Sequence, residues 1–95
     1  MKIDYEKKIA KAALKIRAIK LDPKKPFPGA SGYYMPIYND NRMFLFYPKY
    51  RTLISEAFEE ILQQEEINFE VVAGTSTAGI SPATTLADNL QKPII

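Results

Sequence analysis

The pattern of apolar and polar positions along the chain predicts three helices. In residues 4–16 apolar side chains recur at helical spacing, lysines occupy the other side, and Asp4 is placed to cap the first turn. In residues 48–66 apolar side chains recur at steps of three and four after Pro48, which suits a first helical turn. Ser81 and Pro82 open a third helix that extends to about Leu90.

The remaining apolar runs predict short strands. Residues 33–38 are rich in aromatic and β-branched side chains, and we expect them to pair with the run 43–47 around a turn at residues 39–41. Residues 69–73 are typical of a strand buried on both faces, and residues 93–95 begin another strand after the third helix. A strand, a crossover helix and a second strand predict a parallel pair, and therefore an α/β fold.

Composition narrows the classes of protein that the chain can represent. With 95 residues and 46% hydrophobic content, it predicts a single domain, in which residues 1–47 form an amino-terminal helix and hood and residues 48–95 form the core. The sequence has no cysteine and no histidine, which excludes disulfides, thiolate nucleophiles and metal sites built on those residues. A net charge of +2 does not argue for nucleic acid as a partner.

No apolar run approaches the roughly 20 residues that span a membrane, so we expect a cytoplasmic protein.

A run of small and hydroxylated residues between the second apolar strand and the third helix is the first candidate site. It contains Thr75, Ser76, Thr77, Ala78 and Gly79. Backbone N–H groups at a glycine-containing turn before a helix can bind phosphate, and the hydroxyls add further donors. The residues alone support equally a plain strand-to-helix connection whose hydroxyls cap the helix.

An aromatic segment near charged residues is the second candidate. It contains Tyr33, Tyr34 and Tyr38, which lie near the charged residues Lys20, Asp40 and Arg42. Such a surface could stack a planar ring while a cation meets an acidic substituent. The residues alone favour a plainer interpretation, an apolar edge of the fold with solvated charges at a turn.

Two longer motifs resemble a known family. SGYYMPIYNDNR at positions 31–42 and VVAGTSTAGIS at positions 71–81, together with residues 13–21 and 82–87, resemble the amino-terminal portion of the orotate phosphoribosyltransferases. The resemblance implies a partial type I phosphoribosyltransferase fold, with three helices, a short parallel strand pair and a small aromatic hood. It also implies transfer of ribose phosphate from phosphoribosyl pyrophosphate to orotate in pyrimidine biosynthesis.

The resemblance assigns roles to residues of both candidate sites. The loop from Thr75 to Gly79 matches the segment that binds pyrophosphate, and Tyr38 with Asn39 matches the segment that presents orotate through backbone groups, while Lys20 and Arg42 supply charge. No catalytic residue and no metal ligand is carried over. Mg²⁺ would arrive with phosphoribosyl pyrophosphate, and we expect the chain itself to bind none.

The sequence also departs from the family pattern. Ala30 stands where many relatives have lysine, Gly29 where others have tryptophan, Ala78 where some have lysine, and Arg17 where glycine is expected. The lysine-rich catalytic loop and the ribose-phosphate loop of the family are missing from the 95 residues. We therefore expect a truncated or engineered transferase that is inactive alone.

Two other interpretations remain. Because an incomplete parallel sheet can bury its edges against another chain, one is a noncatalytic, self-associating folding module, and we expect a homo-oligomer. The other is an independent anion-binding module, which rests on the hydroxylated loop alone.

Overall fold

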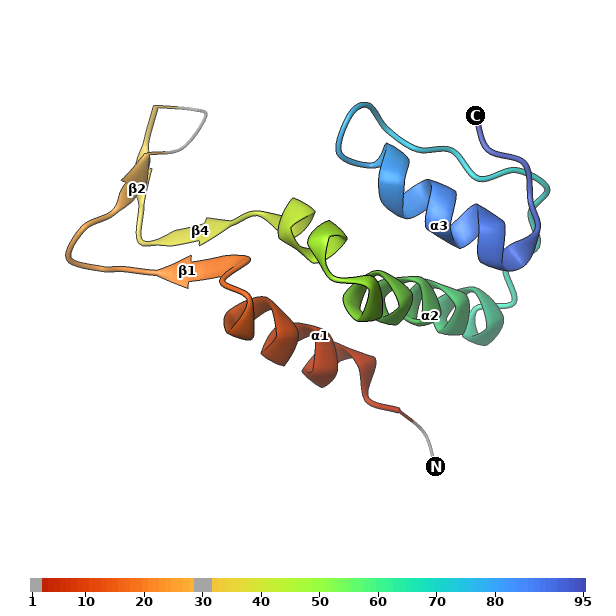
Figure 1. Cartoon of the computed structure of the whole chain (residues 1–95), viewed down its shortest axis with the longest axis horizontal. Helices are drawn as coiled ribbons and strands as arrows, with labels where there is room; N and C mark the ends of the chain where they lie inside the picture. The colour runs from red at the N-terminus through yellow and green to blue at the C-terminus, as the bar shows by residue number, and fades with distance from the viewer. Residues whose placement is uncertain (1–2, 29–31) are drawn as a thin grey trace. The chain divides into compact units, whose positions relative to one another are not determined.

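The computed structural model describes residues 3–28 and 32–95 of the chain, which divides into two compact units, Met1–Phe46 and Tyr47–Ile95 (Figure 1). The elements follow the order α1, β1 to β4, a 3-10 helix η1, α2 and α3. The prediction of a single domain stays a prediction. None of the helices in the described ranges has the length and apolar character needed to cross a bilayer.

The amino-terminal unit joins one helix to an antiparallel hairpin. Helix α1 spans Tyr5–Lys15, and the Asp4 side chain accepts a hydrogen bond from the Lys7 N–H at 3.1 Å, which confirms the predicted cap. Strand β1 (Ile19–Leu21) pairs antiparallel with β4 (Ile37–Asn39), and β2 (Phe27–Pro28) pairs antiparallel with β3 (Tyr34–Met35). The buried side chains of this unit come from α1, its carboxyl end and η1: Ala12, Ala13, Ile16, Ala18 and Phe44.

The predicted pairing of residues 33–38 with residues 43–47 is wrong. Residues Asn41–Phe46 form the 3-10 helix η1, and β4 takes β1 as its partner instead. The reason is local, because the Asp40 carboxylate accepts the Arg42 N–H at 3.1 Å and the Asp40 carbonyl accepts the Met43 N–H at 3.2 Å. An aspartate that bonds the backbone two residues ahead starts a helical turn rather than a hairpin.

The carboxyl-terminal unit contains the other two predicted helices (Figure 1). Helix α2 spans Pro48–Gln64 with Pro48 in its first turn, and α3 spans Ile80–Leu90. The two helices pack on each other, and the Asn89 amide donates to the Ser55 hydroxyl at 2.7 Å. Val72, Ala83 and Ala87 form a buried cluster with Phe69 against it, so α3 covers the segment between the helices.

The predicted parallel strand pair is also wrong, since all named strands of the described ranges pair antiparallel. Residues 72–74 and 93–95 do run side by side in parallel, but they make only an isolated bridge between Val72 and Ile94. A longer ladder would require the residue at position 93 to donate its N–H toward Glu70, and Pro93 has no N–H. The α/β class and the three helices are confirmed.

All three helices end in a left-handed residue that is not glycine. Arg17 has a φ of 63°, Glu66 of 50° and Gln91 of 54°. After α1, the Ala18 N–H bonds the Ala13 carbonyl at 2.9 Å and the Arg17 N–H bonds the Leu14 carbonyl at 3.3 Å, which is the Schellman arrangement. Arg17 therefore takes the conformation that favours the glycine expected there.

Candidate functional site

The hydroxylated loop lies between the bridge segment and α3. Gly74 donates its N–H to the Ile95 carbonyl at 3.3 Å, and the loop then turns through residues 75–79 into the helix. The Gly79 N–H bonds the Thr75 carbonyl at 2.9 Å, and the Ile80 N–H bonds the Thr77 carbonyl at 3.2 Å. The peptide between Ser76 and Thr77 is cis. These bonds bring the five predicted loop residues together at the amino end of α3.

Both glycines of this loop occupy crowded positions. A Cβ on Gly79 would lie 2.6 Å from the Thr75 hydroxyl and 2.8 Å from the Thr75 carbonyl oxygen. A Cβ on Gly74 would lie 2.9 Å from the Ala83 Cβ. Since Cβ atoms do not approach other heavy atoms this closely, glycine at both positions allows the loop to fold tightly onto the start of α3.

The loop presents unbonded donors to solvent. Within the described residues, the backbone N–H groups of Ser76, Thr77 and Ala78 and the side-chain hydroxyls of Thr75, Ser76 and Thr77 make no hydrogen bond, and these four residues are exposed. Further along α3, by contrast, the Thr84 hydroxyl bonds the Ile80 carbonyl at 2.8 Å. Backbone donors at the amino end of an eleven-residue helix favour an anion.

The predicted aromatic site lies on the antiparallel pair of the amino-terminal unit. Lys20 is directly opposite Tyr38 in the β1 and β4 register, and its Nζ lies 6.0 Å from the centre of the Tyr38 ring. The Phe27 ring contacts the Tyr38 ring, with ring centres 5.7 Å apart and ring planes tilted by 42°. Phe27 could not be predicted as part of this site, because it stands between two prolines, where no periodicity identifies a strand.

The backbone of Asn39 is available for binding, whereas that of Tyr38 is not. Asp40 donates its N–H to the Ala18 carbonyl at 2.7 Å, and the hydrogen-bonding direction alternates along a strand. Tyr38 therefore faces its partner Lys20 in the ladder, and the N–H and carbonyl of Asn39 face the open edge of β4. Within the described residues, the Asn39 N–H makes no hydrogen bond.

Arg42 forms a two-point ion pair with Asp40. Its Nε and one terminal nitrogen contact the two carboxylate oxygens at 2.9 and 3.1 Å. The hydrogen bond from this guanidinium lowers the pKa of the Asp40 carboxyl, with a smaller contribution from the charge of Lys20, and the same bond raises the pKa of Arg42. Lys20 makes no ion pair within the described residues. Its charge beside the Tyr38 ring is therefore less neutralised than the charge of Arg42.

The two predicted sites belong to different units. The aromatic site lies in the amino-terminal unit and the hydroxylated loop in the carboxyl-terminal unit. Gly29 and Ala30, where the sequence departs from the family pattern, lie outside the described residues, as does Ser31. In the described ranges no group of three or more acidic side chains gathers in a way that could hold a metal ion.

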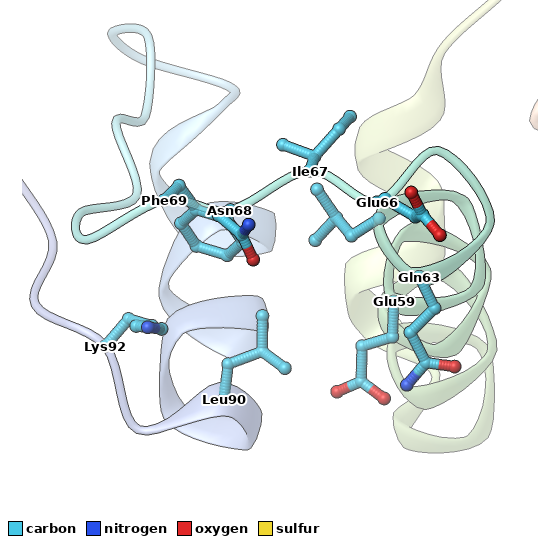
Figure 2. Close-up of a pocket in the computed structure, with 9 residues that line it drawn as sticks. Glu59, Gln63, Glu66, Ile67, Asn68, Phe69, Leu90 and Lys92 are labelled. Carbon is cyan, nitrogen blue, oxygen red and sulfur yellow. The ribbon is translucent and has the colours of Figure 1, made fainter.

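The carboxyl-terminal unit also has an open pocket of about 490 Å³ between the end of α2 and the end of α3. Figure 2 shows Leu90 and Phe69 on one side and Glu59 and Glu66 on the other, and the Nζ of Lys92 lies 5.3 Å from the centre of the Phe69 ring. The pocket contains no residue of either predicted site.

Comparison with known proteins gives a consistent result. No protein-family model matches the chain. The orotate phosphoribosyltransferase of Streptococcus sanguinis is 49% identical over 87 residues, which cover 92% of this chain and 42% of that relative. The solved orotate phosphoribosyltransferase of Aeropyrum pernix aligns with a TM-score of 0.74 at 27% identity and covers 90% of this chain and 50% of that one.

A third comparison supports the fold alone. The structure of Leishmania donovani UMP synthase aligns with a TM-score of 0.76 at 24% identity, over 92% of this chain and 18% of that one. The chain thus spans less than half the length of the curated relatives it matches.

Proposed function

This chain is a homologue of the orotate phosphoribosyltransferases over less than half of their length, and we propose that it supplies the pyrophosphate-binding loop and a portion of the orotate-binding surface of such an enzyme. The observation that carries the proposal is the loop from Thr75 to Gly79. It combines unbonded backbone donors with the amino end of α3, in a chain that is about half identical to enzymes of this family.

The loop would act by stabilising negative charge. When ribose phosphate is transferred to orotate, charge develops on the pyrophosphate that leaves, and fixed N–H donors aimed at it lower the barrier. The N–H groups of Ser76, Thr77 and Ala78 are held by the turn that the Gly79 to Thr75 bond closes. Little reorganisation of these donors is therefore needed when pyrophosphate binds.

The residues of this loop do not fit a resident metal ion. Mg²⁺ prefers carboxylate oxygens and water, and the loop offers N–H and hydroxyl donors without a carboxylate. Mg²⁺ that accompanies phosphoribosyl pyrophosphate would therefore be held by the substrate, and the chain's own residues would bind the phosphate oxygens.

The second half of the proposal concerns orotate. The exposed Tyr38 ring, which contacts Phe27 in a tilted arrangement, offers a surface for a planar pyrimidine, and the free backbone groups of Asn39 can bond its polar edge. Lys20 can then meet the carboxylate of orotate. Arg42 acts through Asp40, by fixing the turn that follows β4.

Titration with pyrophosphate, followed by amide chemical shifts, tests the loop. We expect shifts centred on residues 75–79 that saturate in the wild-type chain and disappear in Ala78→Glu, because the added carboxylate repels the ligand at an exposed position. Ala10→Glu makes the same change at an exposed position of α1 and should bind like the wild type. Equal loss in both variants, or shifts spread over the whole chain, would reject the loop as the site.

Titration with orotate tests the hood. Lys20→Met keeps a long side chain beside Tyr38 and removes its charge, so orotate binding should weaken about tenfold. Lys24→Met removes an exposed lysine from the β1 to β2 connection and should leave binding unchanged. If the two variants bind orotate equally well, Lys20 does not contact the ligand.

An absorbance assay of orotate consumption tests whether the chain alone turns over. We expect no turnover with Mg²⁺ and phosphoribosyl pyrophosphate, since the 95 residues contain no counterpart of the lysine-rich loop that the family resemblance implies. The full Streptococcus sanguinis enzyme provides the positive control. Turnover above background would show that residues of this chain replace that loop.

A further inference from the structure

The pocket of the carboxyl-terminal unit lies where two helices end. Its walls come from the carboxyl-terminal turns of α2, from the segment that follows α2 and from the end of α3 (Figure 2). Its volume of about 490 Å³ suits a small organic molecule. The apolar part of the lining consists of Leu62, Ile67, Phe69 and Leu90.

Both helices contribute negative potential at this end. The carbonyl groups at the carboxyl end of a helix carry partial negative charge, which a lysine or arginine in the last turn often offsets. Helix α1 follows this rule with Lys15. Helices α2 and α3 are described along their whole length, and neither has a basic residue in its last turn. The pocket therefore lies in a region that favours a cation.

Two carboxylates of α2 and of its end add full negative charge. Glu59 and Glu66 both line the pocket, and Figure 2 shows the Glu59 side chain extending toward Leu90 of α3. Glu59 is half-buried, and within the described residues neither carboxylate makes an ion pair or a hydrogen bond. A carboxylate that is partly withdrawn from water and has no partner is stabilised by a cation that bonds it.

Lys92 is the basic residue among the described residues that line the pocket, and its charge lies beside an aromatic ring. Its Nζ is 5.3 Å from the centre of the Phe69 ring, a distance at which the ring attracts a cation. Lys92 makes no ion pair with Glu59 or Glu66. Its ammonium group therefore leaves both carboxylates open to a second cation.

We propose that this pocket binds a small organic ammonium compound, with one positively charged amine and an apolar body about as large as a phenyl ring. The amine would bond the Glu59 carboxylate, and the body would lie on Leu62, Ile67 and Leu90. The charges favour this class over a carboxylic acid, because two carboxylates and two helix ends outweigh the single ammonium group of Lys92. The pocket shares no residue with the loop or the hood, so the proposal does not rest on the proposed function.

Titration of the chain with 2-phenylethylammonium, followed by amide chemical shifts, tests the proposal. We expect saturable shifts centred on residues 66–69 and 90–92, which flank the pocket. Two compounds of similar shape isolate the contribution of the charge. 2-Phenylethanol replaces the amine with a neutral hydroxyl and should bind at least about fivefold more weakly. Phenylacetate reverses the charge and should give no saturable shifts.

Variants locate the bound amine. Glu59→Gln removes the carboxylate at nearly constant shape, so it should weaken 2-phenylethylammonium binding about fivefold and leave 2-phenylethanol binding unchanged. Glu65→Gln is the matched control, because it removes an exposed carboxylate at the end of α2 that does not line the pocket, and it should bind like the wild type. Lys92→Met removes the competing positive charge and should strengthen 2-phenylethylammonium binding about twofold.

Three results would overturn the proposal. The first is that 2-phenylethylammonium gives no saturable shifts at up to about 20 mM, a concentration that detects even weak binding. The second is that phenylacetate or 2-phenylethanol binds as tightly as the ammonium compound, which would show that the carboxylates do not select the ligand. The third is an equal loss in Glu59→Gln and Glu65→Gln, which would indicate attraction to the net charge of this helix end and not a bond to Glu59.

Discussion

Gln91→Gly should stabilise the carboxyl-terminal unit, although it removes a side chain and adds no contact. Gln91 ends α3 with φ 54° and ψ 48°, and its side chain is exposed. The bonds that close the helix come from the backbone, since the Gln91 N–H bonds the Asp88 carbonyl at 3.3 Å and the Lys92 N–H bonds the Ala87 carbonyl at 2.9 Å. Glycine can keep both bonds without the clash between a Cβ and the backbone.

The magnitude follows from two opposing terms. A residue with a Cβ in the left-handed conformation costs roughly 1–2 kcal/mol. Against this gain, glycine lowers stability by about 0.4–1 kcal/mol, because the unfolded chain has more conformations to lose on folding. The free energy of unfolding should therefore rise by about 0.5–1 kcal/mol, which raises the Tm by about 3–6 °C in a small domain.

Urea and thermal unfolding followed by circular dichroism measure this effect. Gln91→Ala serves as the control, because it removes the same polar group but keeps the Cβ, and it should change stability by no more than about 0.3 kcal/mol. If Gln91→Ala stabilises as much as Gln91→Gly, the strain does not come from the Cβ and the reasoning is refuted. A destabilised Gln91→Gly would refute it as well.

Three further predictions test other regions of the structure. Gly79→Ala should abolish the saturable pyrophosphate shifts and lower stability by about 1–3 kcal/mol, because the new Cβ would lie 2.8 Å from the Thr75 carbonyl oxygen. Unchanged binding would contradict the tight loop. Asp40→Asn should destabilise the hood at neutral pH and not in strong acid. The pKa of Asp40 is lowered from 3.8 by the bond from Arg42. The ion pair therefore stabilises the hood fully at pH values above the ordinary pKa, and its contribution is lost as the pH falls through the lowered pKa. A difference in Tm between the wild type and Asp40→Asn that does not change with pH would reject this prediction. Ser55→Ala should lower the free energy of unfolding in urea by about 1 kcal/mol, because the Asn89 amide loses its acceptor. The double variant with Asn89→Ala should be little less stable than either single variant. Additive effects would show that the bond does not couple α2 to α3.

The helices and the position of the loop could be predicted from the residues alone. The apolar spacing of α2, the aspartate before α1 and Pro48 at the start of α2 are local signals, and local signals are enough where the hydrogen bonds join neighbouring residues. The small residues from Gly74 to Gly79 likewise indicated a turn before a helix, because only glycine fits such close approaches.

Strand pairing could not be predicted from the sequence, because it depends on which distant segment reaches each strand edge. Residues 43–47 have the composition of a strand, but the Asp40 carboxylate captures the Arg42 N–H and a 3-10 helix follows. Ile19–Leu21 lies in a proline-rich stretch without periodicity, yet it is the partner that β4 finds. Pro93 likewise prevents the parallel bridge from extending toward Glu70, because it has no N–H to donate.

In the candidate site, too, some features follow from residue types and others depend on the fold. Chemistry that lies within one segment, such as the hydroxyls and N–H groups of the loop, could be identified from residue types alone. The position of Lys20 opposite Tyr38, the tilted contact between the Phe27 and Tyr38 rings and the pairing of Arg42 with Asp40 required the fold of the hairpin. Residue types tell which groups are present, whereas the folded chain selects which of them meet, because contacts between segments distant in sequence depend on strand register and packing.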